Sequence, residues 1–236
     1  EDYNVSRFES DSLKIVNSLL ENGMVPVVVG GSGLYIKALV DGIFDSVDSD
    51  EEYREKLYEQ REKFGNEFLF EELKKIDPES SSKMLPQNWK RVMRALEVFH
   101  LTGQPISKFQ TDYKRQIDVK FILFGLNWNR AKLYSNIEHR VDEMIEKGLV
   151  DEVKNILARG FSKNINALNT VGYKEIISYL GNEITLERAV ELIKRNTRRF
   201  AKRQMTWFRK TKGINWLACN DNTTLEEIVS IILKKM

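Results

Sequence analysis

The segment Gly30-Gly31-Ser32-Gly33-Leu34-Tyr35 holds the first residues whose types and spacing could do chemistry. Paired glycines after an apolar run can bend tightly and present backbone N–H groups to an anion. Ser32 adds a hydroxyl at the same place, so we expect Gly30 and Gly31 to border an anion site that Ser32 faces. The alternative is a plain turn in which Ser32 only caps the following helix. The triplet taken alone favours that alternative, because such triplets are common.

A second candidate is the segment of residues 186–209, which has the spacing of a helix with two unlike faces. The packing face consists of Val190, Ile193, Phe200, Ala201, Gln204, Trp207 and Phe208. The cationic face consists of Lys194, Arg195, Arg198, Arg199, Lys202 and Arg209. A solvated helix face normally interleaves acids at i,i+4 spacing, but residues 192–212 contain none. The pattern therefore favours phosphate binding over a plain solvated face.

Lys90, Arg91 and Arg94 form a second basic cluster at helical spacing, which is weak evidence when taken alone. Trp89 stands beside this cluster. We favour the interpretation that Trp89, like Trp128 and Trp207, is a core or interface residue over the alternative that it is a platform on which bases stack.

The remaining residue types that often do chemistry are sparse. Cys219 is the only cysteine, which excludes an intramolecular disulfide and fits a reducing, cytoplasmic location. His100 and His139 have no partner carboxylate or cysteine nearby in sequence, so we interpret both as structural. No cluster of Cys and His has the spacing of metal ligands, and we predict no metal site built from side chains.

Charge is distributed unevenly over the 236 residues, although the net charge is only +2. Residues 41–79 are rich in acids, whereas residues 194–212 contain none. A polyanionic partner should approach the basic region and avoid the acidic one. No apolar run approaches the length of a membrane span, and the first residues lack a secretory pattern, so we expect no membrane association.

These candidates must be positioned by an α/β core with a helical insertion. Apolar spacing predicts helices over residues 12–22, 34–40, 130–147, 149–159, 171–180, 186–209 and 225–234. Apolar runs predict buried strands over residues 24–29 and 119–128 and a short strand over residues 214–217. The domains expected are residues 1–48, the first part of the core; 49–116, the helical insertion; and 117–236, the second part with the basic helix. Doubly wound sheets usually have about five strands, so this core is incomplete.

Five segments in the same order resemble the tRNA dimethylallyltransferase family, and they extend over nearly the whole chain. They are residues 3–8, 29–39, 91–103 and 171–175, and the most characteristic one, Lys202-Arg203-Gln204-Met205-Thr206-Trp207-Phe208-Arg209. The resemblance implies a P-loop NTPase-like parallel sheet core with a helical insertion. It also implies transfer of a dimethylallyl group from dimethylallyl diphosphate to the N6 amine of the adenosine at tRNA position 37, next to the anticodon.

The resemblance also implies roles for single residues. Ser32 contacts the reacting adenosine, and Gly30, Gly31, Lys174 and Arg209 border the diphosphate. The residues that would contact tRNA are Arg54, Lys90, Arg91, Arg94, Asn169, Tyr173, Arg198, Lys202, Arg203 and Gln204. At Asn169 many relatives have Arg or Gln, which puts this contact in doubt. Mg²⁺ is the implied cofactor, tRNA and dimethylallyl diphosphate are the partners, and a monomer is expected.

Two parts of the family pattern do not match these 236 residues. They are the phosphate-binding loop with its Gly-Lys-Ser/Thr ending and the Asp that acts as general base, both expected upstream. We therefore expect these residues alone to turn over little substrate. The alternatives are a non-catalytic RNA-binding protein that kept the basic helix and a small-molecule phosphotransferase whose basic helix serves only nucleotide phosphates.

Overall fold

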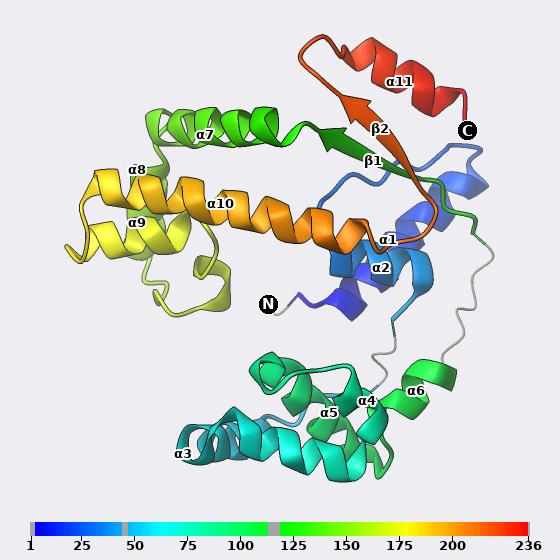
Figure 1. Ribbon diagram of the computed structural model, residues 1–236, viewed down its shortest axis with the longest axis vertical. Helices are drawn as coiled ribbons and strands as arrows, with labels where there is room; N and C mark the ends of the chain where they lie inside the picture. Colours follow the sequence, from blue (N-terminus) through cyan, green and yellow to red (C-terminus); the bar gives the residue numbers. More distant parts are fainter. Residues whose placement is uncertain (1–2, 44–46, 113–118, 236) are drawn as a thin grey trace. The chain divides into compact units, whose positions relative to one another are not determined.

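The computed structural model describes residues 3–43, 47–112 and 119–235. Contacts divide the chain into two compact units, Glu1–Val119 and Lys120–Met236. Helices dominate both units, and the two strands found in the described residues belong to the second unit (Figure 1). The predicted boundary between the insertion and the second part of the core, at residues 116 and 117, lies outside the described residues.

The first unit begins with two helices, α1 (Val5–Glu21) and α2 (Gly33–Asp41), which pack against each other. Asn4 caps α1, because its side chain accepts a hydrogen bond of 2.9 Å from the Arg7 N–H. This cap starts the helix at Val5 rather than at residue 12, so the predicted helix is correct in type but too short.

The prediction of a buried strand over residues 24–29 is wrong. The segment forms no strand, and its side chains are exposed, with Val27 at 76% and Val29 at 91%. A strand is stable when a neighbour pairs with its N–H and C=O groups, and no strand of the described residues lies beside this one. The β-branched run therefore has the propensity of a strand without a pairing partner.

The segment predicted as an insertion is built from helices in its described part. α3 (Glu51–Ile76) bends at Gly65, whose φ of 86° and ψ of 175° are non-helical and strained for other residues. It is followed by α4 (Pro78–Ser82), the 3-10 helix η1 (Pro86–Asn88), α5 (Trp89–Thr102) and α6 (Ile106–Asp112). The core between these helices consists of Leu57, Leu69, Phe70, Leu73, Val92, Met93, Ala95, Leu96, Val98 and Ile106.

Asp77 ties two of these helices together while being only 1% exposed. Its carboxylate accepts hydrogen bonds from the Ser80 N–H at 2.8 Å, in α4, and from the Ser107 N–H at 3.0 Å, in α6. The Ser80 hydroxyl donates a further bond of 2.8 Å. Burial alone would raise the pKa of Asp77, but the bonds from Ser80 and Ser107 outweigh it and hold this pKa below its usual value.

The second unit contains a parallel pair of strands, β1 (Leu123–Trp128) and β2 (Ile214–Cys219), both where strands were predicted. Gly125 and Trp216 are register partners, and a Cβ at Gly125 would lie 2.7 Å from the Trp216 ring. Glycine is therefore required at this position for the two strands to keep their pairing. Leu126 is 49% exposed, so the first strand is less buried than expected.

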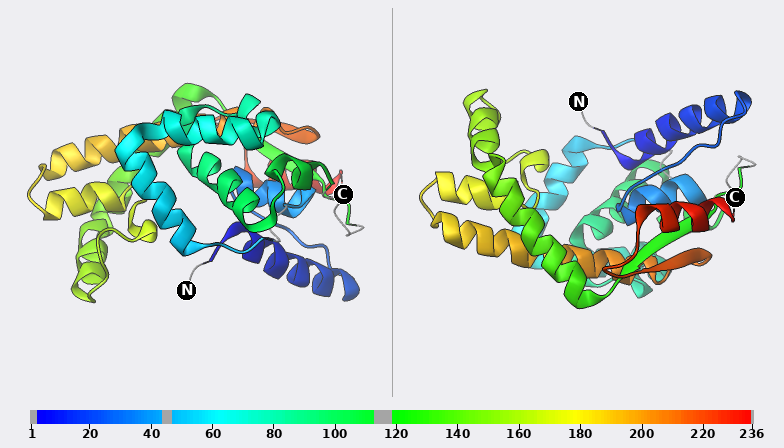
Figure 2. Two further views of the ribbon diagram at one scale, coloured as in Figure 1. Left: turned by 90° about the horizontal axis from the view of Figure 1, so that it is seen from below. Right: turned by 90° about the horizontal axis from the view of Figure 1, so that it is seen from above.

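The helices of the second unit begin and end close to their predicted limits. They are α7 (Arg130–Glu146), α8 (Leu149–Ala158), α9 (Tyr173–Leu180), α10 (Leu186–Phe208) and α11 (Leu225–Leu233). A short 3-10 helix that was not predicted, η2 (Asn166–Leu168), lies between α8 and α9 in the chain. Thr185 caps α10 as expected, since its hydroxyl accepts a 3.2 Å hydrogen bond from the Arg188 N–H. α7 and α9 pack along α10 (Figure 2), and the core that these three helices share with α8 consists of Val141, Leu149, Val153, Ile176, Ala189 and Ile193.

The double cap at Asp77 predicts a pH-dependent loss of stability. Asp77→Asn should lower the free energy of unfolding at pH 7 by about 2 kcal/mol, because the amide keeps only one acceptor oxygen and a hydrogen bond to a charged group is worth about 1.5 to 3 kcal/mol. The folded pKa is depressed, so this contribution is present above the unfolded pKa of about 3.9 and is lost as pH falls through the folded value. Urea unfolding at pH 7 and at successively lower pH would measure it.

Glu79→Gln is the matched control, because Glu79 lies in the same helix but pairs only with Lys83 at the surface. We expect this variant to unfold like the wild type. An Asp77→Asn deficit that stays the same from pH 7 to pH 3 would show that the charge of Asp77 is not what stabilises α4 and α6.

Candidate functional site

Ser32 occupies the N-cap position of α2, but its side chain makes no capping hydrogen bond. Its φ of −79° and ψ of 102° are extended, and the residue is exposed. The plain alternative, in which Ser32 caps the helix, therefore lacks the bond on which it depends. The hydroxyl stands at the start of a helix, where backbone N–H groups favour an anion or a polar substrate.

Gly30 differs from the expectation of a tight glycine turn. Its φ is not positive, and a Cβ built there would meet nothing within 4 Å. The backbone conformation therefore does not require glycine at this position. What Gly30 provides is open space beside the backbone, through which another molecule could approach closely.

The first two segments of the family pattern meet in space. The ring of Phe8, in α1, stacks on the ring of Tyr35, in α2, with centroids 4.5 Å apart and an interplanar angle of 24°. Such a contact contributes roughly 1 kcal/mol beyond the area it buries. It fixes the start of α2, and with it Ser32, against α1.

The basic helix α10 divides into two halves with different surroundings. In the first half Ala189 and Ile193 are buried against neighbouring helices. Lys194 lies 2.6 Å from Asp142, and Arg198 lies 2.7 Å from Glu138, and both acids belong to α7. Acids are absent from α10 itself after Glu191, but α7 supplies them. Phosphate binding by Arg198 therefore competes with an internal ion pair.

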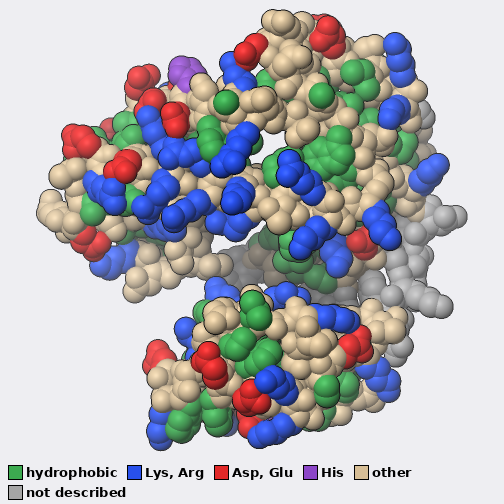
Figure 3. All heavy atoms as spheres, viewed as in Figure 1, with side chains coloured by type: hydrophobic (Ala, Val, Ile, Leu, Met, Phe, Trp, Pro, Cys, Tyr) green, Lys and Arg blue, Asp and Glu red, His purple; other side chains and the backbone are tan. Residues whose placement is uncertain are grey.

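The second half of α10 keeps its cations unpaired. Arg199, Lys202, Arg203 and Arg209 are exposed, and no acid of the described residues forms an ion pair with them. Figure 3 shows Lys and Arg side chains gathered along this helix. This half is where the cations predicted to bind phosphate remain available.

The predicted packing face of α10 is wrong in this second half. Phe200 is 46% exposed and Trp207 is 44% exposed, although periodicity placed both on the buried face. Gln204, on the same face, is half-buried. Periodicity defines which residues share a face, whereas burial also needs a second element to cover that face.

A buried carboxylate orders the segment before α9. Glu175 is 4% exposed and accepts hydrogen bonds from the Gly172 N–H at 2.8 Å and from Asn196 Nδ2, in α10, at 2.7 Å. Gly172 has a φ of 105°, a conformation that favours glycine. The Lys174 ammonium lies 3.9 Å from Glu175, and its side chain is 45% exposed. Sequence reasoning missed Glu175 and Asn196 as supports of this segment, although a Glu at the third position of a helix often accepts a hydrogen bond from the N-cap N–H, as Glu175 does from Gly172.

The other predicted residues of this segment have unlike surroundings. The Tyr173 hydroxyl donates a hydrogen bond to Glu152 in α8, and this bond raises the pKa of Tyr173. Asn169 is exposed and ends η2. Tyr173 is thus engaged within the fold, while Asn169 is open to solvent.

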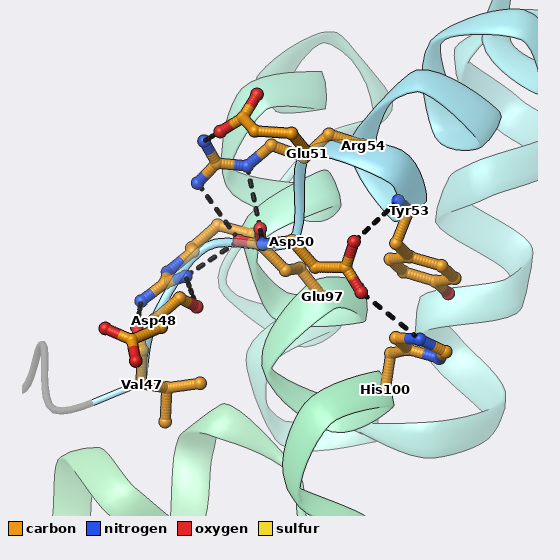
Figure 4. A network of polar contacts seen from close by, with 9 residues as sticks. Val47, Asp48, Asp50, Glu51, Tyr53, Arg54, Glu97 and His100 are labelled. Carbon is orange, nitrogen blue, oxygen red and sulfur yellow. Dashed lines mark hydrogen bonds and ion pairs between the residues drawn. The ribbon is translucent and has the colours of Figure 1, made fainter.

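In the insertion, Arg54 and Arg94 both form ion pairs with Glu97. Figure 4 shows Arg54 and Glu97 within this network of polar contacts. Arg54 Nε lies 2.8 Å from Glu97, and Arg94 Nη1 lies 2.7 Å from it. Arg94 also donates to the carbonyl oxygens of Val47 at 2.7 Å and Asp48 at 3.3 Å. The assignment of these two arginines to tRNA contact therefore competes with an internal role, because Arg54 is bound through Nε, Nη1 and Nη2 and Arg94 through Nη1 and Nη2.

Glu97 is completely buried, at 0% exposure. Burial alone would raise the pKa of Glu97, but hydrogen bonds from Arg94, the Asp50 N–H and Arg54 hold it below its usual value. The Asp50 N–H bond is 2.9 Å long, so one carboxylate joins α5 to the chain that enters α3.

Both histidines have a carboxylate neighbour, which corrects the interpretation that they are isolated. His100 stacks on Tyr53 with centroids 3.9 Å apart, and its Nε2 lies 3.7 Å from Asp50. His139 Nε2 lies 3.0 Å from Glu143, one helical turn away. A structural role remains the simplest account of both, because each contact lies within one packed unit.

Lys90 and Arg91 remain at the surface of α5. No acid of the described residues pairs with either of them, in contrast to Arg94. The described residues contain no group of three or more His, Cys, Asp or Glu side chains arranged to hold a metal ion. No helix in the same residues is long and apolar enough to cross a membrane.

Comparison with known proteins identifies the class to which these features belong. The profile of the family described as IPP transferase matches residues 1–211, and the chain belongs to this family. It is 46% identical to the tRNA dimethylallyltransferase of Pelotomaculum thermopropionicum, covering 99% of this chain and 74% of that protein. It is 42% identical to the tRNA dimethylallyltransferase of Caldanaerobacter subterraneus, covering 97% of this chain and 74% of that protein.

Solved structures support the same conclusion. The tRNA isopentenylpyrophosphate transferase of Bacillus halodurans matches with a TM-score of 0.66 and 34% identity, over 100% of this chain and 74% of that one. A eukaryotic dimethylallyltransferase acting on tRNA matches with a TM-score of 0.79 and 26% identity, over 100% of this chain and 62% of that one. The predicted fold class, an α/β core with a parallel sheet and a helical insertion, is confirmed.

The two halves of α10 predict different electrostatic roles. Lys202→Ala should lower the slope of log affinity for tRNA against log salt by about 0.7 to 0.9, the value for one phosphate contact. Arg198→Ala should lower it by less, because Glu138 already balances its charge. Binding of unmodified tRNA over a series of KCl concentrations measures both. Equal slopes for Lys202→Ala and the wild type would favour a plain solvated face.

Proposed function

We propose that this chain works in the transfer of a dimethylallyl group from dimethylallyl diphosphate to the N6 amine of adenosine 37 in tRNA. The observation that carries the proposal is the exposed Ser32 at the start of α2, free of any capping bond, within a segment that matches the family pattern. The relatives that support it are named tRNA dimethylallyltransferases.

The reaction forms a bond between N6 of the adenosine and C1 of the prenyl group and breaks the bond from C1 to the diphosphate oxygen. The diphosphate leaves with the electrons of the broken bond, and the amine proton passes to the general-base Asp that the family pattern places upstream. Ser32 accepts a hydrogen bond from the N6 amine and so turns the nitrogen lone pair towards C1. Ser32 can do so because its hydroxyl has no other task in α2.

The leaving group gains negative charge as the bond breaks, and fixed positive groups stabilise it. In the proposal, the N–H groups beside Gly30 and Gly31 provide such stabilisation, and the resemblance to the family gives the same task to the cations Lys174 and Arg209. Lys174 is held near the buried Glu175, while Arg209 is exposed at the end of α10.

In the proposal, Mg²⁺ is the counterion that binds the diphosphate. This ion usually keeps several waters and binds substrate phosphates with one or two carboxylates, so it needs no cage of protein side chains. The side chains of the described residues offer no such cage, and no step is assigned to the ion.

We further propose that tRNA is held on the second half of α10 and on the insertion, by a monomer working in the cytoplasm. Phosphate contacts on two sides would hold the anticodon loop while adenosine 37 leaves its stack. A single cysteine, buried as Cys219, fits a reducing compartment.

Ser32→Ala in the complete gene product tests the chemistry. We expect kcat to fall roughly 100-fold, while the affinity for tRNA stays as in the wild type. Unfolding free energy should change by less than about 0.5 kcal/mol, because no cap bond is lost. Incorporation of labelled dimethylallyl into an unmodified anticodon stem-loop is the measurement.

Ser32→Thr is the matched control, because it keeps the hydroxyl, and it should retain activity. Full activity in Ser32→Ala together with a stability loss of about 1 kcal/mol would make Ser32 a helix cap. Absence of transfer by the wild type itself would favour the RNA-binding or phosphotransferase alternatives.

A further inference from the structure

Six of the eleven Lys and Arg side chains in the described part of the insertion form ion pairs with its own acids. At its surface the ion pairs are Lys56 with Glu52, Lys74 with Glu71, Lys75 with Glu72, and Lys83 with Glu79. Arg54 and Arg94 are bound to the buried Glu97. Exposed pairs of this kind leave little net charge to attract a polyanion.

Arg61 is held in a different way. Its guanidinium carbon lies 4.1 Å from the centre of the Trp89 ring, and its Nε donates a 2.9 Å hydrogen bond to Asn66. Tyr58 meets the same indole edge-on, with centroids 5.8 Å apart. These contacts fix the guanidinium, and its two terminal nitrogens have no partner in the part of the chain that the structure describes.

One further cation lies at the same tryptophan, and a second follows it in α5. The Lys90 ammonium is 5.4 Å from the centre of the Trp89 ring. Arg91 follows it on the exposed side of α5. None of Arg61, Lys90 and Arg91 forms an ion pair with an acid of the described residues, so three positive charges remain uncompensated by direct contact.

We propose that Arg61 and Lys90, both held over the Trp89 ring, bind the phosphate backbone of the RNA substrate together with the neighbouring exposed Arg91 of α5. A guanidinium held flat on an aromatic ring keeps its charge, and its two terminal nitrogens can meet a phosphate in the fork geometry that arginine favours. The inference rests on the proposed function, because it takes tRNA as the polyanion. It also moves the contact of the insertion away from Arg54 and Arg94, whose donors are engaged with Glu97.

Trp89 acts in this surface as a support for cations. Arg61 and Lys90 lie over its ring, which leaves less of the ring open to a nucleobase. The surface therefore recognises charge and spacing and carries no sequence preference of its own. A solvated arginine would lack the two contacts that immobilise Arg61, so plain surface charge does not account for this geometry.

Binding of unmodified tRNA to the complete gene product, over a series of KCl concentrations, tests the proposal. Arg61→Ala should weaken binding about tenfold and lower the salt slope by about 0.7 to 0.9. Lys90→Ala with Arg91→Ala should lower the slope by about twice that amount. Arg61→Lys should keep most of the slope but lose affinity, because the charge remains and the fork is gone.

Lys56→Ala is the matched control, since it removes one positive charge from the same helix but from an ion pair with Glu52. It should bind tRNA with the slope of the wild type. If Arg61→Ala folds normally and matches Lys56→Ala in slope and affinity, the proposed surface is wrong.

Prenyl transfer by the wild type separates this inference from the proposed function. Transfer by the wild type with no binding defect in Arg61→Ala would overturn the surface and leave the function standing. Failure of the wild type to bind or modify tRNA would overturn both.

Discussion

Carboxylates buried away from water are the constraint on which much of this structure depends. A buried charge is costly unless hydrogen bonds replace the lost water, so each one gathers donors around it. Glu97 gathers Arg54, Arg94 and the Asp50 N–H, and thereby joins α5 to the start of α3. Asp77 joins α4 to α6, and Glu175 joins the start of α9 to α10, by the same means.

This constraint also decides which cations are left for RNA. When a cation binds an acid of the same fold, its N–H donors are occupied and its charge is balanced. This is the case for Arg94 at Glu97 and for Arg198 at Glu138. A basic sequence pattern therefore overestimates the number of cations available to bind RNA wherever another helix supplies acids. On α10 the acids of α7 reach Lys194 and Arg198 but do not pair with Lys202.

Local sequence predicted the elements governed by local interactions. Residue spacing indicated the helix that became α10, and Thr185 was recognised as its cap. Contacts between residues far apart could not be predicted, because no spacing encodes them: Lys194 meets Asp142, 52 positions away. The prediction of a strand over residues 24–29 failed for the same reason, since a β-branched run favours the conformation of a strand but does not specify its pairing partner. The position of Ser32 at the start of α2 was predictable, and the absence of its capping bond was not.

An aromatic ring can also hold a cation in place, and unlike an acid it leaves the charge of that cation available for binding. An acid fixes an arginine and cancels its charge, whereas a ring fixes it and leaves the charge in place. The pair of Arg61 on Trp89 uses this second way in the insertion. On the exposed half of α10, the Arg203 guanidinium lies 5.7 Å from the ring of Phe200, itself largely open to solvent. Exposed aromatic residues beside unpaired arginines can therefore have a role at the surface, even where their spacing predicts a core position. They hold positive charge at fixed places, which is what a phosphate backbone of regular spacing selects.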